Sequence, residues 1–191
     1  MKLFLIFIGA VFIENYVLTY FLGMCPFFGV SKKTETALGM GLSVFFVMTI
    51  SSAMTFSFYQ YVLLPLNITY LNTVVFILII ASIVQFLEVF MKKKFAVLYS
   101  LLGVYLPLIT VNCAIFGVTL MNIKNKYSLL ESVVDSAGAG LGFTLAIVLL
   151  AGIREKYDNN PDVSVLFKGF PLALFAAGLM SIAFMGFQGI I

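Results

Sequence analysis

Residues 25–30 of this chain read CPFFGV, and residues 113–118 read CAIFGV. Each stretch begins with one of the only two cysteines among the 191 residues and ends in Phe-Gly-Val. A glycine-rich segment follows each of them: GMGLSVF begins at Gly39, and GAGLGF begins at Gly138. A local pattern that recurs in each half predicts an internal repeat, with repeat one at about 1–93 and repeat two at about 94–191.

The composition around these stretches is that of a membrane protein. Hydrophobic residues make up 62% of the chain, charged residues 10%, and the mean hydropathy is +1.13. A soluble domain is about half apolar and about a quarter charged. We therefore expect an all-α integral membrane protein with a single transmembrane domain over residues 1–191. The net charge of +3 comes without a basic strip interleaved with aromatic residues, which argues against nucleic-acid binding.

Hydrophobic runs of about twenty residues, the length that crosses a bilayer as a helix, predict six transmembrane helices. The expected spans are about 3–23, 37–64, 71–91, 95–121, 133–153 and 167–190. The loops after the first, third and fifth spans carry most of the basic residues: Lys32, Lys33, Lys92, Lys93, Lys94, Arg154, Lys156 and Lys168. Lys2, Lys124 and Lys126 fall on the other side. By the positive-inside rule, the basic loops face the cytoplasm and both termini face out.

The two halves then enter the membrane from opposite sides, which predicts an inverted three-plus-three repeat. Straight helices would hold Cys25 near the cytoplasmic face and Cys113 near the outer face, because a helix rises 1.5 Å per residue. Proline and glycine weaken a helix. The residues that favour an interruption are Pro26, Gly29, Gly103, Pro107 and Gly117. We therefore predict interrupted first and fourth helices that bring both cysteines near the middle of the bilayer.

The chemistry of the two thiols has several interpretations. A single cysteine in a membrane helix is usually a small buried hydrophobic residue, and a structural disulfide is a second alternative. Equivalent positions in an inverted repeat favour a shared task. Zinc and iron–sulfur sites usually need four ligands, and this chain contains no histidine. A partner chain with two more cysteines would complete a four-cysteine site at an interface.

Four stretches carry a resemblance to a known family: ENYVLTYFLGMCPFFGVSKK, LGVYLPLITVNCAIFGV, GAGLGFTLAIVLLAGIREK and GFPLALFAAGLMSIAFMGFQG. They resemble the family formed by RnfA of the Rnf ion-translocating oxidoreductase complex and NqrE of the sodium-translocating NADH:quinone oxidoreductase. The likeness covers nearly the whole chain. YVLLPLNITYLNTVVFILIIASIVQFLEVFMKK and the closing GFQG favour the Rnf side of the family.

The resemblance implies a membrane protein that pairs with a homologous, RnfE-like partner of opposite orientation. Each of the two would give two cysteines to one intramembrane [2Fe–2S] cluster, so Cys25 and Cys113 would be the ligands here. The complex, together with RnfB, RnfC, RnfD and RnfG, would couple electron transfer from ferredoxin to NAD⁺ to Na⁺ or H⁺ translocation across the bacterial cytoplasmic membrane. The resemblance places flavins on other chains of the complex.

Further polar residues are candidates for supporting roles. Backbone N–H groups at broken helix ends, including those of the Phe-Gly-Val turns, and the side chain of Asn112 are possible donors to an anionic cluster. Glu14 and Asn15 lie within the first span and belong either to an ion path or to a helix contact. Asp135 suits the outer N-terminus of the fifth helix.

Other functions remain open from the residues alone. Serines and threonines of the second span are either helix-packing residues or a polar ion route; they are Ser43, Thr49, Ser51, Ser52, Thr55 and Ser57. The alternatives to an Rnf protein are NqrE of the NADH:quinone complex, a non-redox inverted-repeat transporter and a structural scaffold.

Overall fold

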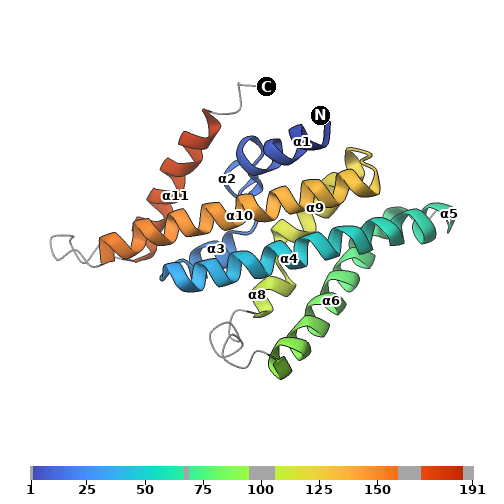
Figure 1. The fold of residues 1–191 in the computed structure, drawn as a ribbon, viewed down its shortest axis with the longest axis horizontal. Coiled ribbons are helices and arrows are strands. Elements are labelled where there is room, and N and C mark those ends of the chain that lie inside the picture. Colours follow the sequence, from blue (N-terminus) through green and yellow to red (C-terminus); the bar gives the residue numbers. More distant parts are fainter. Residues whose placement is uncertain (1, 67–68, 95–105, 159–168, 187–191) are drawn as a thin grey trace.

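The computed structural model describes residues 2–66, 69–94, 106–158 and 169–186, and every regular element in these ranges is a helix (Figure 1). The α-helices are α1 Lys2–Ile8, α2 Tyr16–Tyr20, α3 Met24–Val30, α4 Thr34–Phe58, α5 Leu64–Leu66, α6 Asn72–Lys94, α8 Leu106–Thr110, α9 Cys113–Lys124, α10 Leu129–Asp158 and α11 Phe170–Met185. Two π-helices, η1 Gly9–Ile13 and η2 Tyr59–Leu63, and a 3₁₀-helix, η3 Thr69–Leu71, complete the set in these ranges. The all-α prediction is confirmed for the described residues.

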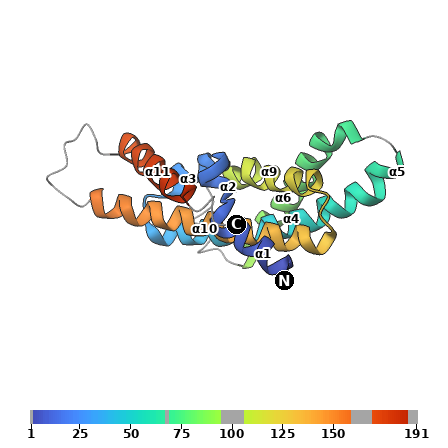
Figure 2. The ribbon, with the colours of Figure 1, turned by 90° about the horizontal axis from the view of Figure 1, so that it is seen from above.

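The long helices α4 and α10 lie side by side and run in opposite directions through the centre of the molecule (Figure 1). Glycines let them approach closely. A Cβ added at Gly41 would lie 2.6 Å from Cγ2 of Thr144, and one added at Gly140 would lie 2.8 Å from Cα of Phe45. Figure 2 shows the short helices α2, α3 and α9 on one side of this pair. The shorter helices α2, α3 and α9 therefore pack on one side of the α4–α10 pair.

The first hydrophobic segment is broken twice. Asn15 begins α2 as an N-cap, with its Oδ1 accepting a hydrogen bond of 3.1 Å from the N–H of Val17. The helix α2 ends where Phe21 takes the left-handed conformation with φ 54°. Gly23 follows with φ 83° and precedes α3. A left-handed phenylalanine is uncommon and costs energy, so the packing around it must hold this break in place.

The second break has the same kind of residue at its cap. The helix α8 ends at Thr110, and Asn112 caps α9, which begins at Cys113. The Oδ1 of Asn112 accepts a hydrogen bond of 3.0 Å from the N–H of Ala114. Interruptions beside both cysteines were predicted, and the structure contains them. The depth of the two thiols in a bilayer stays a prediction.

The residues expected to interrupt the helices lie at different places relative to the breaks. Pro26 lies in the first turn of α3 and Pro107 in the first turn of α8, where a missing N–H costs little. Gly29 and Gly117 lie inside α3 and α9. Gly103 lies outside the described residues. Pro26 agrees with the first break, because in a continuous helix its ring would clash with the carbonyl four residues earlier. Left-handed backbone and asparagine caps also mark the breaks.

Within the described residues, four helical segments are long and apolar enough to cross a membrane: Thr34–Leu63, Asn72–Phe90, Pro107–Lys124 and Leu129–Tyr157. Two further apolar helices, Lys2–Ile13 and Phe170–Met185, are shorter. These elements overlap the six predicted spans, but the first span is divided into pieces and residues 95–105 of the fourth lie outside the described ranges. The six-span arrangement and its division into two repeats stay predictions.

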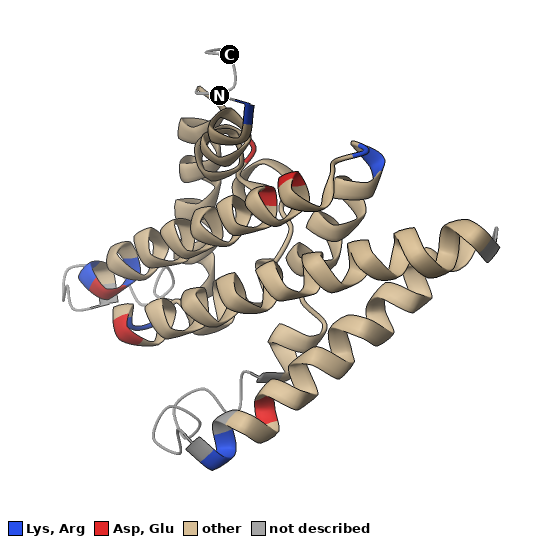
Figure 3. Cartoon of the chain, turned by 45° about the vertical axis from the view of Figure 1, so that its right-hand side comes forward, with Lys and Arg blue, Asp and Glu red and all other residues tan. Residues whose placement is uncertain are grey.

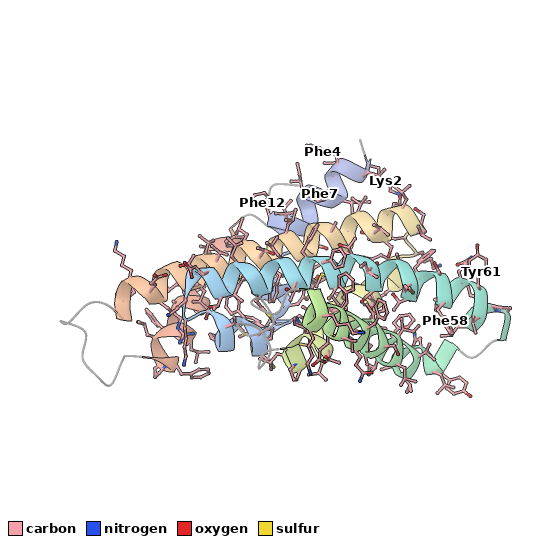
Figure 4. All side chains as sticks on the ribbon, turned by 60° about the horizontal axis from the view of Figure 1, so that its bottom comes forward. Lys2, Phe4, Phe7, Phe12, Phe58 and Tyr61 are labelled. Carbon is pink, nitrogen blue, oxygen red and sulfur yellow. The ribbon has the colours of Figure 1, made fainter. Side chains whose placement is uncertain are left out.

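The surface of the molecule is dominated by apolar side chains. Phe4 is 66% exposed, Phe12 45% and Tyr61 79%, and Figure 4 shows these side chains on the outside of the bundle. Figure 3 shows the lysine- and arginine-bearing ends of α4, α6 and α10 at one side, with the turn between α9 and α10 at the opposite side. An apolar surface between two charged ends suits a lipid bilayer.

Candidate functional site

The two cysteine loops meet at a hydrogen bond. The backbone N–H of Gly23 donates to Sγ of Cys113 over 2.9 Å, joining residues 90 positions apart. Cys25 stands two residues after Gly23, in the first turn of α3. The broken helices therefore bring the two halves of the sequence pattern together, and the arrangement that straight helices would impose does not occur.

The contact depends on the absence of a side chain at Gly23. A Cβ at this position would lie 3.0 Å from Cβ of Ala114 and 3.1 Å from Cε2 of Phe143. Both distances are tighter than ordinary van der Waals contact, and the positive φ of Gly23 also favours glycine. Gly23 was not among the predicted site residues. The signal that could have found it is its position two residues before a cysteine at a predicted interruption.

Both thiols are free and exposed at the surface of the chain. The residues beside them are exposed and apolar as well: Phe21 is 52% exposed and Val111 is 77% exposed. The site is thus an open face rather than an enclosed pocket. A second chain can reach both sulfur atoms from outside.

The donor set matches half of a four-thiolate iron–sulfur site. Iron–sulfur clusters are held by cysteine thiolates and tuned by hydrogen bonds to the sulfurs, and the N–H of Gly23 already supplies such a bond to Cys113. Within the ranges that the structure describes, no group of three or more His, Cys, Asp or Glu side chains could hold a metal ion. The chemistry of the two thiols would fit a shared cluster to which this chain would give two ligands.

The Phe-Gly-Val turns do not have the role that we expected for them. Residues 28–30 close α3 and residues 116–118 lie within α9, so these are helical residues rather than broken ends. The backbone donor that reaches a sulfur comes from Gly23 instead. Asn112, the other expected donor, caps α9 directly before Cys113, so its side chain lies at the site.

Glu14 and Asn15 have different surroundings. Asn15 is 1% exposed, and its Nδ2 donates to the carbonyl of Gly142 over 3.0 Å. This contact ties the start of α2 to α10, which is a helix-packing role. Glu14 is exposed and caps the C-terminal end of η1, where its backbone N–H donates to the carbonyl of Gly9. Neither side chain has a hydrogen bond to the cysteines among the described contacts.

Asp135 lies deeper than predicted. The helix α10 begins at Leu129, so Asp135 is beyond the first turn, and it is only 4% exposed. The hydroxyl of Tyr16 donates to its Oδ2 over 3.3 Å. The first turn instead holds Glu131, which accepts from the N–H of Ser128 over 3.0 Å as in a capping box. The expected helix-dipole role of Asp135 is wrong because the helix starts earlier.

Most polar residues of the second span form hydrogen bonds within their own helix, α4. Hydroxyls in α4 donate to backbone carbonyls four positions earlier: Ser43 to Gly39, Thr49 to Phe45, Thr55 to Ser51 and Ser57 to Ala53. Ser52 is different, because its hydroxyl lies 2.8 Å from that of Ser132 on α10. Asn122 of α9 donates to Ser136 over 3.0 Å in the same cluster. This buried cluster joins α4, α9 and α10.

Arg154 anchors the helix that carries Cys25. It extends from α10, is 6% exposed, and its Nη1 donates over 2.9 Å both to the carbonyl of Phe28 and to Oγ of Ser31. A cation at the C-terminus of a helix also complements the helix dipole. The helix α3 is therefore held at its C-terminal end, while Gly23 holds the loop at its other end.

Comparison with known proteins places the chain among membrane components of redox complexes. A family model described as "Rnf-Nqr subunit, membrane protein" matches residues 3–191. The chain is 54% identical, over 99% of its length and 98% of the relative's, to the subunit designated A of the Na(+)-translocating ferredoxin:NAD(+) oxidoreductase complex of Acetobacterium woodii. It is 52% identical, over 98% and 96%, to the subunit designated A of an ion-translocating oxidoreductase complex of Pseudoalteromonas translucida.

A protein of Syntrophotalea carbinolica with the same name as the second relative is 50% identical over 100% of this chain and 98% of its own. These matches run through both cysteine stretches, because they cover nearly the whole sequence. The family expected from the sequence motifs is confirmed. The chain belongs to the Rnf-Nqr family of membrane subunits.

Proposed function

We propose that this chain is the RnfA component of an Rnf-type complex and carries electrons through a [2Fe–2S] cluster shared with a homologous membrane partner. The observation that carries the proposal is the hydrogen bond from Gly23 to Sγ of Cys113, which brings two exposed cysteine loops to one face. The names of the relatives, which belong to ion-translocating oxidoreductase complexes, support the same assignment.

The residues of this chain have distinct tasks in the proposal. Cys25 and Cys113 hold two of the four ligand positions, and the N–H of Gly23 offsets negative charge at Cys113. Arg154 keeps α3, and with it Cys25, against α10. When bound, such a cluster supplies one-electron transfer, and a carrier within the bilayer divides the distance of roughly 30 Å across the hydrocarbon core.

The exposure of the site requires a partner. Two thiols cannot complete a four-cysteine set, and both lie on an open face beside Phe21 and Val111. A homologous, RnfE-like protein of opposite orientation would present the same motif from the other side. RnfB, RnfC, RnfD and RnfG would supply the flavins, the soluble iron–sulfur clusters and the nucleotide chemistry.

The membrane arrangement in the proposal follows from charge and topology. The basic ends of α4, α6 and α10 lie at one side of the molecule (Figure 3), which would be the cytoplasmic side of the bacterial inner membrane. Both termini would then face out. The antiparallel α4 and α10, together with the two interruptions, support an inverted three-plus-three repeat of six transmembrane helices.

The complex as a whole would couple electron transfer between ferredoxin and NAD⁺ to Na⁺ or H⁺ translocation. The name of the Acetobacterium woodii relative, at 54% identity, favours ferredoxin and NAD⁺ over the NADH:quinone reaction. The alternatives from the sequence are a component of the NADH:quinone complex and a non-redox transporter. No observation on the described residues favours either of them.

The test is low-temperature electron paramagnetic resonance (EPR) with iron analysis on the protein purified together with its partner. Wild type is compared with Cys25→Ser and Cys113→Ser, and thermal unfolding of each variant shows that the bundle is intact. We expect a reduced [2Fe–2S] signal that is lost in each variant. An iron-free complex, or variants that keep the full signal, would contradict shared ligation by these residues.

A further inference from the structure

Asn15 and Asn112 are a matched pair of buried helix caps. Each begins a helix after an interruption, and each side-chain Oδ1 accepts a hydrogen bond from a backbone N–H two residues later. Asn15 is 1% exposed and Asn112 is 3% exposed. Both Oδ1 atoms therefore accept a capping hydrogen bond, and the two residues differ in the partners of Nδ2.

The two amide donors differ in whether the chain uses them. Nδ2 of Asn15 donates to the carbonyl of Gly142 over 3.0 Å. Nδ2 of Asn112 is buried and has no hydrogen-bond partner within the described residues. The N–H of Ala114 donates to one side-chain atom of Asn112, so that atom must be the oxygen. Flipping the amide would leave the N–H of Ala114 without an acceptor. Burying a donor without an acceptor is costly, so an acceptor from outside the described residues is expected.

Asn112 lies at the cysteine site. It immediately precedes Cys113, and its Oδ1 lies 3.3 Å from the position that a Cβ on Gly23 would occupy. The N–H of Gly23 is the group that donates to Sγ of Cys113. The side chain that carries the unused donor therefore borders the contact between the two loops that carry the thiols.

A water molecule is the competing acceptor. A cavity of about 150 Å³ lies beside Asn112, and its lining consists of Ile77, Ile80, Thr110, Val111, Asn112 and Phe116. Four of these six side chains are apolar. A buried water needs two to four polar partners, and the side chains of this lining offer only the minimum of two, Thr110 and Asn112. A sulfur acceptor at the thiol site better explains a donor placed next to Cys113.

We propose that Nδ2 of Asn112 donates a hydrogen bond to a sulfur of the iron–sulfur centre held by Cys25 and Cys113, and that this bond raises the reduction potential of the centre. The inference rests on the proposed function, because it needs the cluster. Asn112 does not ligate iron. It acts on the centre through charge, together with the N–H of Gly23.

The direction of the effect follows from electrostatics. One-electron reduction adds a negative charge to the centre, and a donor stabilises the more negative form more strongly. In a low-dielectric membrane this difference is larger than in water. Removing the donor should therefore lower the reduction potential while leaving the two thiol ligands in place.

The experiment uses the purified complex and a potentiometric titration followed by EPR. Asn112→Ser keeps a side-chain oxygen for the cap and removes the amide donor. Asn15→Ser is the matched control, because its donor is used by Gly142. Deuteron electron–nuclear double resonance (ENDOR) in D₂O counts exchangeable hydrogens coupled to the cluster. Asn112→Asp, which also caps well, is the second variant if the serine variant fails to assemble.

We expect Asn112→Ser to keep its iron and to shift the titration to lower potential. At the wild-type midpoint its reduced-to-oxidised ratio should fall roughly three- to tenfold, where tenfold corresponds to about 59 mV for a one-electron couple. One exchangeable deuteron coupling should disappear. Asn15→Ser should lose stability without moving the midpoint.

Other results would overturn the proposal. An unchanged midpoint and an unchanged deuteron spectrum in Asn112→Ser would show that the donor bonds to water or to nothing. Loss of the cluster or of assembly in both Asn112 variants would show that Asn112 is a structural cap. A wild-type complex without any cluster would instead refute the proposed function, which makes the two failures distinguishable.

Discussion

The N–H of Gly23 lies 2.9 Å from Sγ of Cys113, so a residue that separates α2 from α3 contacts the first residue of α9. The contact joins two loops from different halves of the chain. It requires an interruption in each half, and it leaves both thiols exposed to a second protein.

Gly23→Ala should damage this contact. The left-handed φ of 83° costs an alanine about 1–2 kcal/mol, and its Cβ would lie 3.0 Å from Cβ of Ala114. We expect a lower melting temperature in detergent and a lower iron content of the complex. Gly152→Ala is the control, since a Cβ at Gly152 meets nothing within 4 Å. Equal behaviour of the two variants would contradict the assignment.

Gly140→Ala should separate the two central helices. The new Cβ would lie 2.8 Å from Cα of Phe45, a backbone atom that moves only with α4. Overpacking of this kind typically costs about 1–3 kcal/mol. Thermal unfolding of the solubilised protein measures the effect, and Gly178→Ala, a helical glycine with open space around it, should be neutral or stabilising. A neutral Gly140→Ala would show that the two helices do not pack this closely.

Arg154→Gln should loosen α3. The variant removes charged donors from the carbonyl of Phe28 and the hydroxyl of Ser31. Hydrogen bonds to charged groups are worth about 1.5–3 kcal/mol each, so a clear loss of thermal stability is expected. The EPR line shape of the complex should also broaden if α3 positions Cys25. Lys156→Gln, at the exposed end of the same helix, serves as the comparison and should change neither property.

Tyr16→Phe should destabilise the bundle because Asp135 is buried and accepts a bond from the Tyr16 hydroxyl. Leaving a buried carboxylate without this donor is expected to cost about 1–3 kcal/mol or more. A double-mutant cycle with Asp135→Asn, followed by thermal unfolding, isolates the coupling, which should be about 0.5–3 kcal/mol. Additive effects would mean that the two side chains do not interact.

The local pattern of the sequence was sufficient for the class of protein, the family and the interrupted helices. Hydrophobic runs and the paired cysteine motifs predicted an all-α membrane protein with breaks at Cys25 and Cys113, and these breaks are present. The residues at the breaks themselves, Phe21, Gly23 and Asn112, were not named as helix breakers. Proline is the residue that sequence rules associate with a break, but Pro26 and Pro107 lie in first turns, where they are compatible with a helix.

The burial of individual polar residues could not be predicted from the sequence. Asp135 was expected at a helix end, because the start of α10 cannot be read to within a turn from a hydrophobic pattern. The role of Arg154 was missed because its partner at Phe28 is 126 positions away. Contacts of this kind depend on how helices pack, and packing is not encoded in any single stretch.

The residues that can do chemistry are evident from the amino-acid sequence, because it contains only two cysteines and no histidine. Its hydrophobic runs likewise require apolar helices. The groups that surround the thiols emerge only from the packed bundle: the N–H of Gly23 at Cys113 and the unused amide of Asn112 beside it. A hydrogen bond depends on distances of a few tenths of an ångström, and between segments 90 residues apart only helix packing defines such distances.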